Sequence, residues 1–298
     1  MKTTGIRGYD IKPPKKSAFS IDTPVDMIRL HTLLLAVGKR GGGKSVAVSN
    51  LVENMVAQGV MDRVLLISPT YYSNKEICAP LNIKEDDIFE DPNKAAIQHV
   101  LDIVDAEREE YDTYVEDLKL YNAYTRDISS TKPVSQMSAS MLINALERGW
   151  LENTTVPEKP EKKYPKSKGP PKLALIVDDA MATKLFQPSS GFVNLCIKHR
   201  HVGKGLGISI FILAQSYAAV GGVPRPIRGN ATHLMLLKNK DTNQIAKICS
   251  EIGTDIDCGE FLKMFKYATA EPFGFLMIDF SPKSKQQTFR KNFNEYIV

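Results

Sequence analysis

The chain has 298 residues, 43% of them hydrophobic and 24% charged, which suits one large globular domain or two small ones. It carries 39 lysines and arginines against 34 acidic residues. The formal net charge of +5 permits contact with a polyanion without requiring it. No run approaches the roughly 18 apolar residues of a membrane span, and the first residues lack the apolar core of a signal peptide, so we expect a soluble chain.

The four cysteines are the next feature that composition constrains. They form no C-x-x-C pair, so reduced thiols in a cytosol-like compartment are expected rather than disulfides or a zinc site. Residues 1–27 are expected to form an extended N-terminal arm or a frayed terminus.

The first motif reads Gly-Lys-Arg-Gly-Gly-Gly-Lys-Ser over residues 38–45. It follows a short apolar run at 31–37 that predicts a buried strand, and it precedes residues 46–58, whose apolar positions recur at helical spacing. G-x-x-x-x-G-K-S between a strand and a helix is the pattern of a phosphate-binding loop, here called the P-loop. We expect backbone N–H groups and the helix N-terminus to hold phosphates, Lys44 to reach the β- and γ-phosphates, and Ser45 to ligate Mg²⁺. The predicted nucleotide-binding residues are Gly38, Lys39, Arg40, Gly41, Gly42, Gly43, Lys44, Ser45 and Val46.

A second buried strand is predicted at 63–68. Thr70 and the following pair Tyr71 and Tyr72 leave its carboxyl end, where ligands gather in open α/β sheets. These residues therefore either face a nucleotide or nucleic acid, or form a packed turn.

The middle of the chain predicts a helical insertion at about 90–172. Apolar residues recur every seven positions from Ile97 to Leu118, which predicts a helix over 93–125 that forms a hairpin on the core or packs on a neighbouring subunit. A second helix is predicted at 138–148 with Ser138 as its N-cap. Residues 157–172 hold five prolines and six lysines, so we expect a loop that is either solvated or in contact with DNA phosphates.

The second motif is a continuous apolar run, residues 173–177, that ends in Asp178 and Asp179. Downstream of a P-loop this pattern indicates a Walker B strand, in which Asp178 holds the Mg²⁺ shell and Asp179 orients the attacking water as general base. Another long apolar strand, 206–214, ends in Gln215. An amide there can sense the γ-phosphate or position water.

The last third of the chain predicts a helix at 191–198, a strand at 232–237, helices near 241–250 and 260–267, and a strand at 274–280 that closes the sheet. Residues 281–298 carry four lysines and arginines and are expected to form a basic, partly disordered tail.

Together the motifs at 38–45, 173–179 and 207–215 resemble those of the FtsK–HerA superfamily of P-loop ATPases. Within that superfamily the chain is most similar to the genome-packaging ATPases of eukaryotic large DNA viruses and virophages. The similarity to this viral group rests on four features. They are the residues 68–73 that follow the second strand, the Asp-Asp end of the Walker B strand, Arg200 and His201 before the strand that ends in Gln215, and a length close to that of a bare motor domain. The resemblance covers roughly residues 28–280.

The resemblance implies an α/β fold: a RecA-like P-loop NTPase core with an extra strand between the Walker A and Walker B strands. It also implies ATP and Mg²⁺ as cofactors and a homo-oligomeric ring, pentamer or hexamer, that threads double-stranded DNA in the virion or host cytoplasm. Capsid or membrane-associated virion proteins are further implied partners. In that family an arginine before the Gln strand enters the neighbouring site. Arg200 is the nearest match, with Lys204, Arg225 and Arg228 as rivals.

One departure concerns the base position, which is usually Glu in cellular members and is Asp179 here. The expected function is an ATP-driven translocase of double-stranded DNA, most similar to a viral genome-packaging motor. Other enzymes with a P-loop, such as a kinase or a helicase or segregation ATPase of the same superfamily, are alternatives. A nucleotide-binding structural component of a capsid vertex is another.

Overall fold

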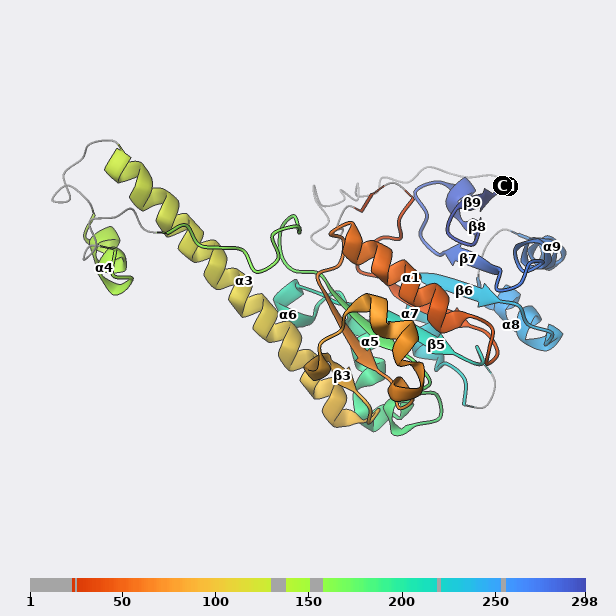
Figure 1. Cartoon of the computed structure of the whole chain (residues 1–298). Coiled ribbons are helices and arrows are strands. Elements are labelled where there is room, and N and C mark those ends of the chain that lie inside the picture. Colours follow the sequence, from red (N-terminus) through yellow and green to blue (C-terminus); the bar gives the residue numbers. More distant parts are fainter. Residues whose placement is uncertain (1–22, 25, 130–137, 151–157, 219–220, 253–255) are drawn as a thin grey trace, which may run out of the picture.

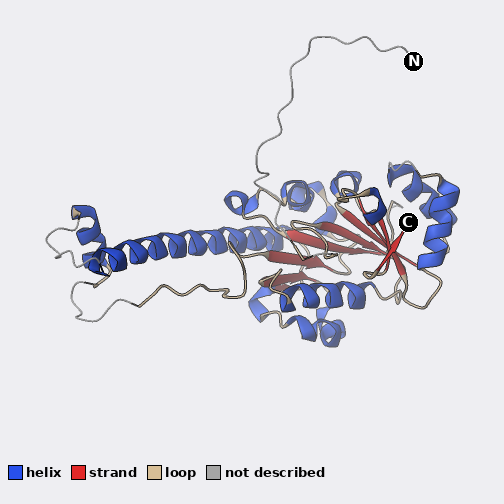
Figure 2. Cartoon of the chain, turned by 90° about the horizontal axis from the view of Figure 1, so that it is seen from above, coloured by secondary structure: helices blue, strands red, loops and turns tan. Residues whose placement is uncertain are grey.

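The computed structural model describes residues 23–24, 26–129, 138–150, 158–218, 221–252 and 256–298. In this part of the chain one sheet runs in the order β3-β2-β4-β5-β1-β6-β7-β8-β9, and helices cover both of its faces (Figures 1 and 2). The strands are β1 (Leu33–Val37), β2 (Arg63–Ile67), β3 (Ile88–Phe89), β4 (Leu173–Val177), β5 (Ser209–Ala214), β6 (His233–Leu237), β7 (Phe275–Asp279), β8 (Phe289–Lys291) and β9 (Glu295–Ile297). The helices are α1 (Lys44–Ala57), α2 (Lys75–Cys78), α3 (Lys94–Ser129), α4 (Ala139–Glu147), α5 (Phe192–Lys198), α6 (Val202–Gly205), α7 (Arg225–Asn230), α8 (Thr242–Ile252) and α9 (Cys258–Ala268).

Every residue of the central strands β1, β4 and β6 is buried, and all of them except His233 are apolar, because both faces of the sheet are covered. Successive side chains of β1 lie on opposite faces of the sheet. Leu34 and Ala36 pack with α1, whereas Leu33, Leu35 and Val37 pack with the first turns of α3 and with α5, α8 and α9. The alternation places the end of β1 between two apolar layers, which fixes the loop that follows it.

The order of the strands confirms the predicted class of fold. From β3 to β6 the sheet is parallel, and β5 lies between β1, which precedes the P-loop, and β4, which ends in the two aspartates. This is the extra strand between the Walker A and Walker B strands. The carboxyl ends of β1, β4 and β5 therefore meet at one edge of the sheet.

The sheet continues past residue 280, so the expectation that 274–280 closes it is wrong. β8 and β9 add to β7 as antiparallel strands. The turn between β8 and β9 packs on β7, with the Phe293 ring 4.8 Å from that of Phe275. Tyr296 Oη donates to Asp26 Oδ1 at 2.8 Å, which ties the end of the chain to the residues before β1. The predicted basic tail is thus partly built into the sheet, while most of the predicted N-terminal arm lies outside the described residues.

Helix α3 departs from the predicted hairpin on the core. Only its first turns, with Ile97, Val100 and Val104, are buried against the body. The rest projects away as a stalk and carries α4 near its far end (Figures 1 and 2). Ser138 caps α4 as predicted, since its Oγ accepts from the N–H of Met141. Among the described residues, no helix combines the length and the apolar character needed to cross a bilayer.

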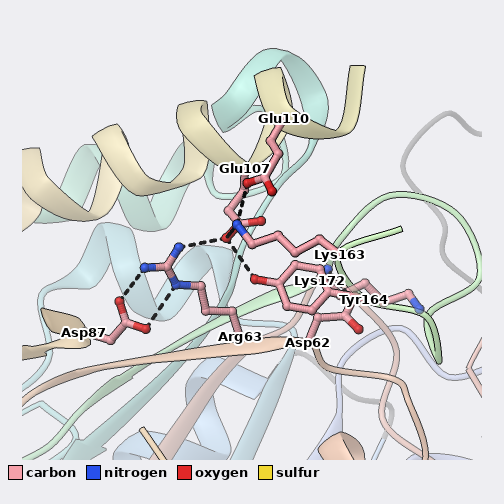
Figure 3. A network of polar contacts seen from close by, with 8 residues as sticks. All are labelled: Asp62, Arg63, Asp87, Glu107, Glu110, Lys163, Tyr164 and Lys172. Atoms are coloured by element: carbon pink, nitrogen blue, oxygen red, sulfur yellow. Dashed lines mark hydrogen bonds and ion pairs between the residues drawn. The ribbon is translucent and has the colours of Figure 1, made fainter. Parts of the chain in front are cut away.

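A polar network fixes the root of the stalk (Figure 3). Arg63, the first residue of β2, donates to Asp87 Oδ1 and Oδ2 at 2.6 and 3.0 Å and to Glu107 Oε1 at 2.7 Å. Lys163 Nζ and Tyr164 Oη also donate to Glu107, at 2.9 and 2.8 Å. Residues 158–172 form a loop, as predicted, and most of them are exposed, while Lys163 and Tyr164 tie the loop to α3; residue 157 lies outside the described part.

The cysteines correct the expectation that all thiols are reduced. Cys249 of α8 and Cys258, the first residue of α9, form a disulfide with their Cα atoms 5.8 Å apart. Cys78 and Cys196 are free thiols. The sequence pattern missed the pair because the packing of α8 against α9 brings the two cysteines together.

Candidate nucleotide-binding site

The P-loop joins β1 to α1 as the sequence predicts. Gly43 is the residue before the first turn of α1 and has φ +92°, a left-handed conformation that glycine adopts without strain. Helix α1 then begins at Lys44, and the first three residues of the helix line the cavity described below. A loop of this kind presents several N–H donors to one anion.

Lys44 is buried at the base of the loop, with 8% of its surface exposed. Its Nζ donates to the carbonyl oxygens of Gly38 at 2.8 Å and Lys39 at 3.1 Å. Burial lowers the pKa of Lys44, and the charges of Asp178 and Asp179 partly oppose that effect. An ammonium held in this way gains from an anion placed beside it.

Ser45 connects the loop to the Walker B strand. Its Oγ donates to Asp178 Oδ2 at 2.7 Å. Burial raises the pKa of Asp178, although the hydrogen bond from Ser45 and the charge of Lys44 oppose this. A hydroxyl and a carboxylate oxygen in contact are a donor set that suits Mg²⁺, which takes one or two protein oxygens and completes its shell with phosphates and water. The two side chains that the sequence assigned to Mg²⁺ therefore lie together and fit that ion.

Asp179 and Gln215 form the next pair. Gln215 Nε2 donates to Asp179 Oδ1 at 3.2 Å, so the ends of β4 and β5 are joined through the two residues predicted as base and sensor. Asp179 has φ +50°, which is uncommon outside glycine, asparagine and aspartate. The turn directs Asp178 toward Ser45 and Asp179 toward Gln215.

These groups surround one cavity of about 450 Å³. Thr70 lines it, which supports the nucleotide-facing interpretation of that residue, whereas Tyr71 and Tyr72 lie outside its lining. Six lining residues are not among the predicted ones: Ser73, Asn74, Ile77, Met181, Leu213 and Phe273. The first three follow the end of β2, a signal that could have found them. Phe273 has no such signal, because it reaches the cavity only through the pairing of β7 with β6.

Arg200 lies away from this cavity. Its charge acts on His31, which precedes β1, and on His233, the first residue of β6, so it stands near the amino ends of the parallel strands. The side chain is exposed. Of its rivals, Arg228 is engaged within the chain, since its Nε and Nη2 donate to Glu251 at 2.9 and 3.0 Å. Arg225 is exposed, and Lys204 Nζ lies 3.8 Å from Glu109.

No protein-family model matches the sequence, and no curated protein matches it either. Solved structures do match. One is the genome packaging NTPase B204 of Sulfolobus turreted icosahedral virus 2 in complex with ATP-gammaS, at 11% identity and a TM-score of 0.43, with 87% of this chain and 95% of that chain covered.

Two further matches are ATPases 2 and 3 of EssC from Geobacillus thermodenitrificans and the pCW3 conjugation coupling protein TcpA. EssC has 14% identity and a TM-score of 0.41, with 76% of this chain and 36% of that chain covered. TcpA has 13% identity and a TM-score of 0.34, with 73% and 52% covered. By its own strand order and the contacts of Lys44, Ser45 and Asp178, the chain has the fold of a P-loop NTPase with an additional strand.

Proposed function

We propose that the protein is a Mg²⁺-dependent ATPase. The observation that carries this is the 2.7 Å contact between Ser45 Oγ and Asp178 Oδ2, which joins the P-loop to the Walker B strand beside the paired Asp179 and Gln215. A phosphate-binding loop alone would bind an anion. The added carboxylates supply a metal site and a base at the position where a γ-phosphate would lie.

Each side chain has a distinct role in this proposal. Ser45 and Asp178 would hold the metal ion, which neutralises charge on the phosphates when bound. Lys44 exchanges its two carbonyl acceptors for phosphate oxygens. Asp179 accepts a proton from the attacking water, and Gln215, already bonded to Asp179, holds that carboxylate in place and senses whether the γ-phosphate is present.

We further propose that hydrolysis drives movement of double-stranded DNA, as in a viral genome-packaging motor. The support is the set of motifs that resembles the packaging ATPases, together with the position of Arg200. An exposed arginine far from its own cavity suits a ring in which each copy completes the site of the next. DNA contact through phosphates would be independent of sequence and would weaken steeply with salt.

Replacement of Lys44 by Ala tests the ATPase proposal. Measuring phosphate release with and without duplex DNA, we expect turnover of the wild-type chain to rise with DNA and the Lys44→Ala variant to lose turnover in both conditions. Lys263→Ala, which removes an exposed lysine of α9, is the matched control and should behave as wild type. Unchanged turnover in Lys44→Ala would refute the site.

The effect of duplex DNA on turnover distinguishes a DNA motor from the alternative functions. Wild-type turnover that ignores duplex DNA would favour a nucleotide-binding structural component over a motor. Strand separation in a parallel assay would favour a helicase of the same fold.

A further inference from the structure

Two large apolar side chains are exposed at the cavity that the P-loop lines. Val46, in the first turn of α1, has 48% of its surface exposed, and Phe273 has 69%. Both line the cavity. Phosphate and metal binding do not call for either side chain, because those ligands are recognised by N–H groups, Lys44 and carboxylates.

The strand order places Phe273 at the same edge of the sheet as the P-loop. It precedes β7, which runs antiparallel to β6, with Phe275 opposite Leu237. β6 in turn pairs with β1. The ring lies against the loop itself, since a Cβ built on Gly43 would stand 3.0 Å from Cδ1 of Phe273.

The backbone around Phe273 is held in an unusual conformation. Phe273 has φ +62°, which is unfavourable for a bulky residue. Gly274 follows it, and a Cβ there would come within 2.5 Å of the carbonyl oxygen of Ala268, so only glycine fits. Strained residues of this kind gather at ligand sites, where the surrounding chain holds them in place.

The two flanks of the P-loop differ in chemistry. In the order β4-β5-β1-β6-β7, the carboxylates and Gln215 come from β4 and β5 on one side of β1, and Phe273 comes from β7 on the other. A triphosphate whose γ-phosphate faces Asp179 therefore has its α-phosphate end directed toward Val46 and Phe273. We propose that Phe273, with Val46 beside it, is the platform on which the nucleobase stacks; this inference rests on the proposed nucleotide site.

Stacking recognises the face of a base rather than its edge. Replacing an aromatic platform by alanine weakens base binding by roughly five- to a hundredfold, and the interaction tolerates different bases because each has a π-face. The site should therefore bind ATP and GTP within a few fold of each other, and pyrimidine nucleotides more weakly because their single ring offers a smaller face for stacking.

The experiment compares a ligand that has a base with one that lacks it. Dissociation constants of a non-hydrolysable ATP analogue and of inorganic tripolyphosphate, both with Mg²⁺, are measured for the wild-type chain and for Phe273→Ala. We expect the variant to lose about tenfold or more in affinity for the nucleotide and less than about twofold for tripolyphosphate. Phe273→Trp should retain both affinities. Tyr72→Ala removes an aromatic side chain that is similarly exposed, at 72%, but lies outside the cavity lining, and it should change neither.

A second variant guards against an effect of backbone strain. Phe273→Gly removes the ring and also relieves the positive φ, so the same selective loss of nucleotide affinity in a chain at least as stable as wild type supports the platform. Equal losses for nucleotide and tripolyphosphate would show that the ring only supports Gly43, and unchanged nucleotide affinity would show no contact. Either result overturns this proposal while leaving the ATPase proposal intact. A wild-type chain that binds neither ligand overturns both.

Discussion

Asp179 shows at the scale of a single residue how this site separates two adjacent carboxylates. With φ +50° at Asp179, Asp178 contacts Ser45 while Asp179 accepts from Gln215. Aspartate tolerates this conformation better than most residues, because its short polar side chain can bond locally. An aspartate at the proposed base position is thus compatible with the turn, and the hydrogen bond from Gln215 holds its carboxylate in place.

Replacing Asp179 by Asn should separate chemistry from binding. Asn keeps the size and the tolerance of positive φ but cannot accept the proton of water, so we expect kcat to fall by about 10² to 10⁴, with nucleotide affinity and Tm close to those of wild type. Phosphate release, calorimetric titration and thermal melting measure the three quantities. Retention of turnover would remove Asp179 from the role of base.

Asp178 gives the complementary result. Asp178→Asn should weaken nucleotide binding only when Mg²⁺ is present, because the change removes a metal ligand rather than a phosphate donor. Titrations with and without the metal test this. A loss of affinity that is equal in both conditions would contradict the assignment.

At the scale of elements, the root of α3 depends on one buried carboxylate. Burial alone would raise the pKa of Glu107, but hydrogen bonds from Lys163, Arg63 and Tyr164 outweigh it and hold that pKa below its ordinary value. Glu107 thereby joins β2, α3 and the loop 158–172 (Figure 3). The stalk is fixed by this contact as well as by the apolar side chains of its first turns.

Removing that carboxylate should loosen the root. Glu107→Ala leaves Arg63 and Lys163 without their shared acceptor, so we expect a loss of about 3 kcal/mol in the free energy of unfolding. Glu110→Ala is the matched control: the Glu110 side chain is 54% exposed and pairs with Lys163, and its loss should cost less than about 1 kcal/mol. Urea denaturation measures both. Equal effects of the two substitutions would show that the network does not hold the stalk.

The elements also show where sequence patterns succeed and fail. β1, β4, β5 and β7 are apolar runs bounded by turns, so their existence could be predicted to within a few residues. β3 is too short for any periodicity, and β8 carries Arg290 and Lys291, which resemble a basic tail until the antiparallel pairing with β7 is known. Motif spacing found Lys44, Ser45, Asp178, Asp179 and Gln215 because each follows a strand. It missed Phe273, which comes before one.

At the scale of the whole molecule, buried histidines make the fold sensitive to acid. Burial lowers the pKa of His31 and of His233 to about 4, and it also lowers the pKa of His199. Between pH 6.5 and 4 the unfolded chain therefore binds protons that the folded chain does not. Stability rises with pH through this window and is lost as the pH falls.

The size of this effect can be measured between pH 7 and 5, above the range in which most carboxylates titrate. A gap of this width corresponds to roughly 3 kcal/mol for each of His31 and His233 over the full window. We expect the urea concentration at the unfolding midpoint to fall steadily as the pH is lowered from 7 to 5. The slope of the unfolding free energy against pH gives the number of protons taken up on unfolding, and His233→Gln should lower that number by up to one. A slope of zero for the wild-type chain would contradict the burial of these rings.

The proposed ring offers a test of Arg200. We expect Lys44→Ala and Arg200→Ala chains each to lose activity, the latter by about 10³-fold or more, and a mixture of the two to regain part of it. Recovery arises because some interfaces combine the intact P-loop of one chain with the intact arginine of the other. A mixture of Lys44→Ala with Arg225→Ala that recovers, while the Arg200 mixture does not, would assign the role to Arg225.

The stalk has a mechanical consequence. A helix of 36 residues is about 54 Å long. The part of it beyond Glu107 is about 33 Å long, so a tilt of one degree at Glu107 moves the far end by about 0.6 Å. The root is bonded to Arg63, at the start of β2, and Thr70 at the other end of that strand lines the nucleotide cavity. A tilt of three or four degrees at Glu107 would therefore move α4 by about 2 Å, and β2 alone separates this point from the proposed nucleotide site.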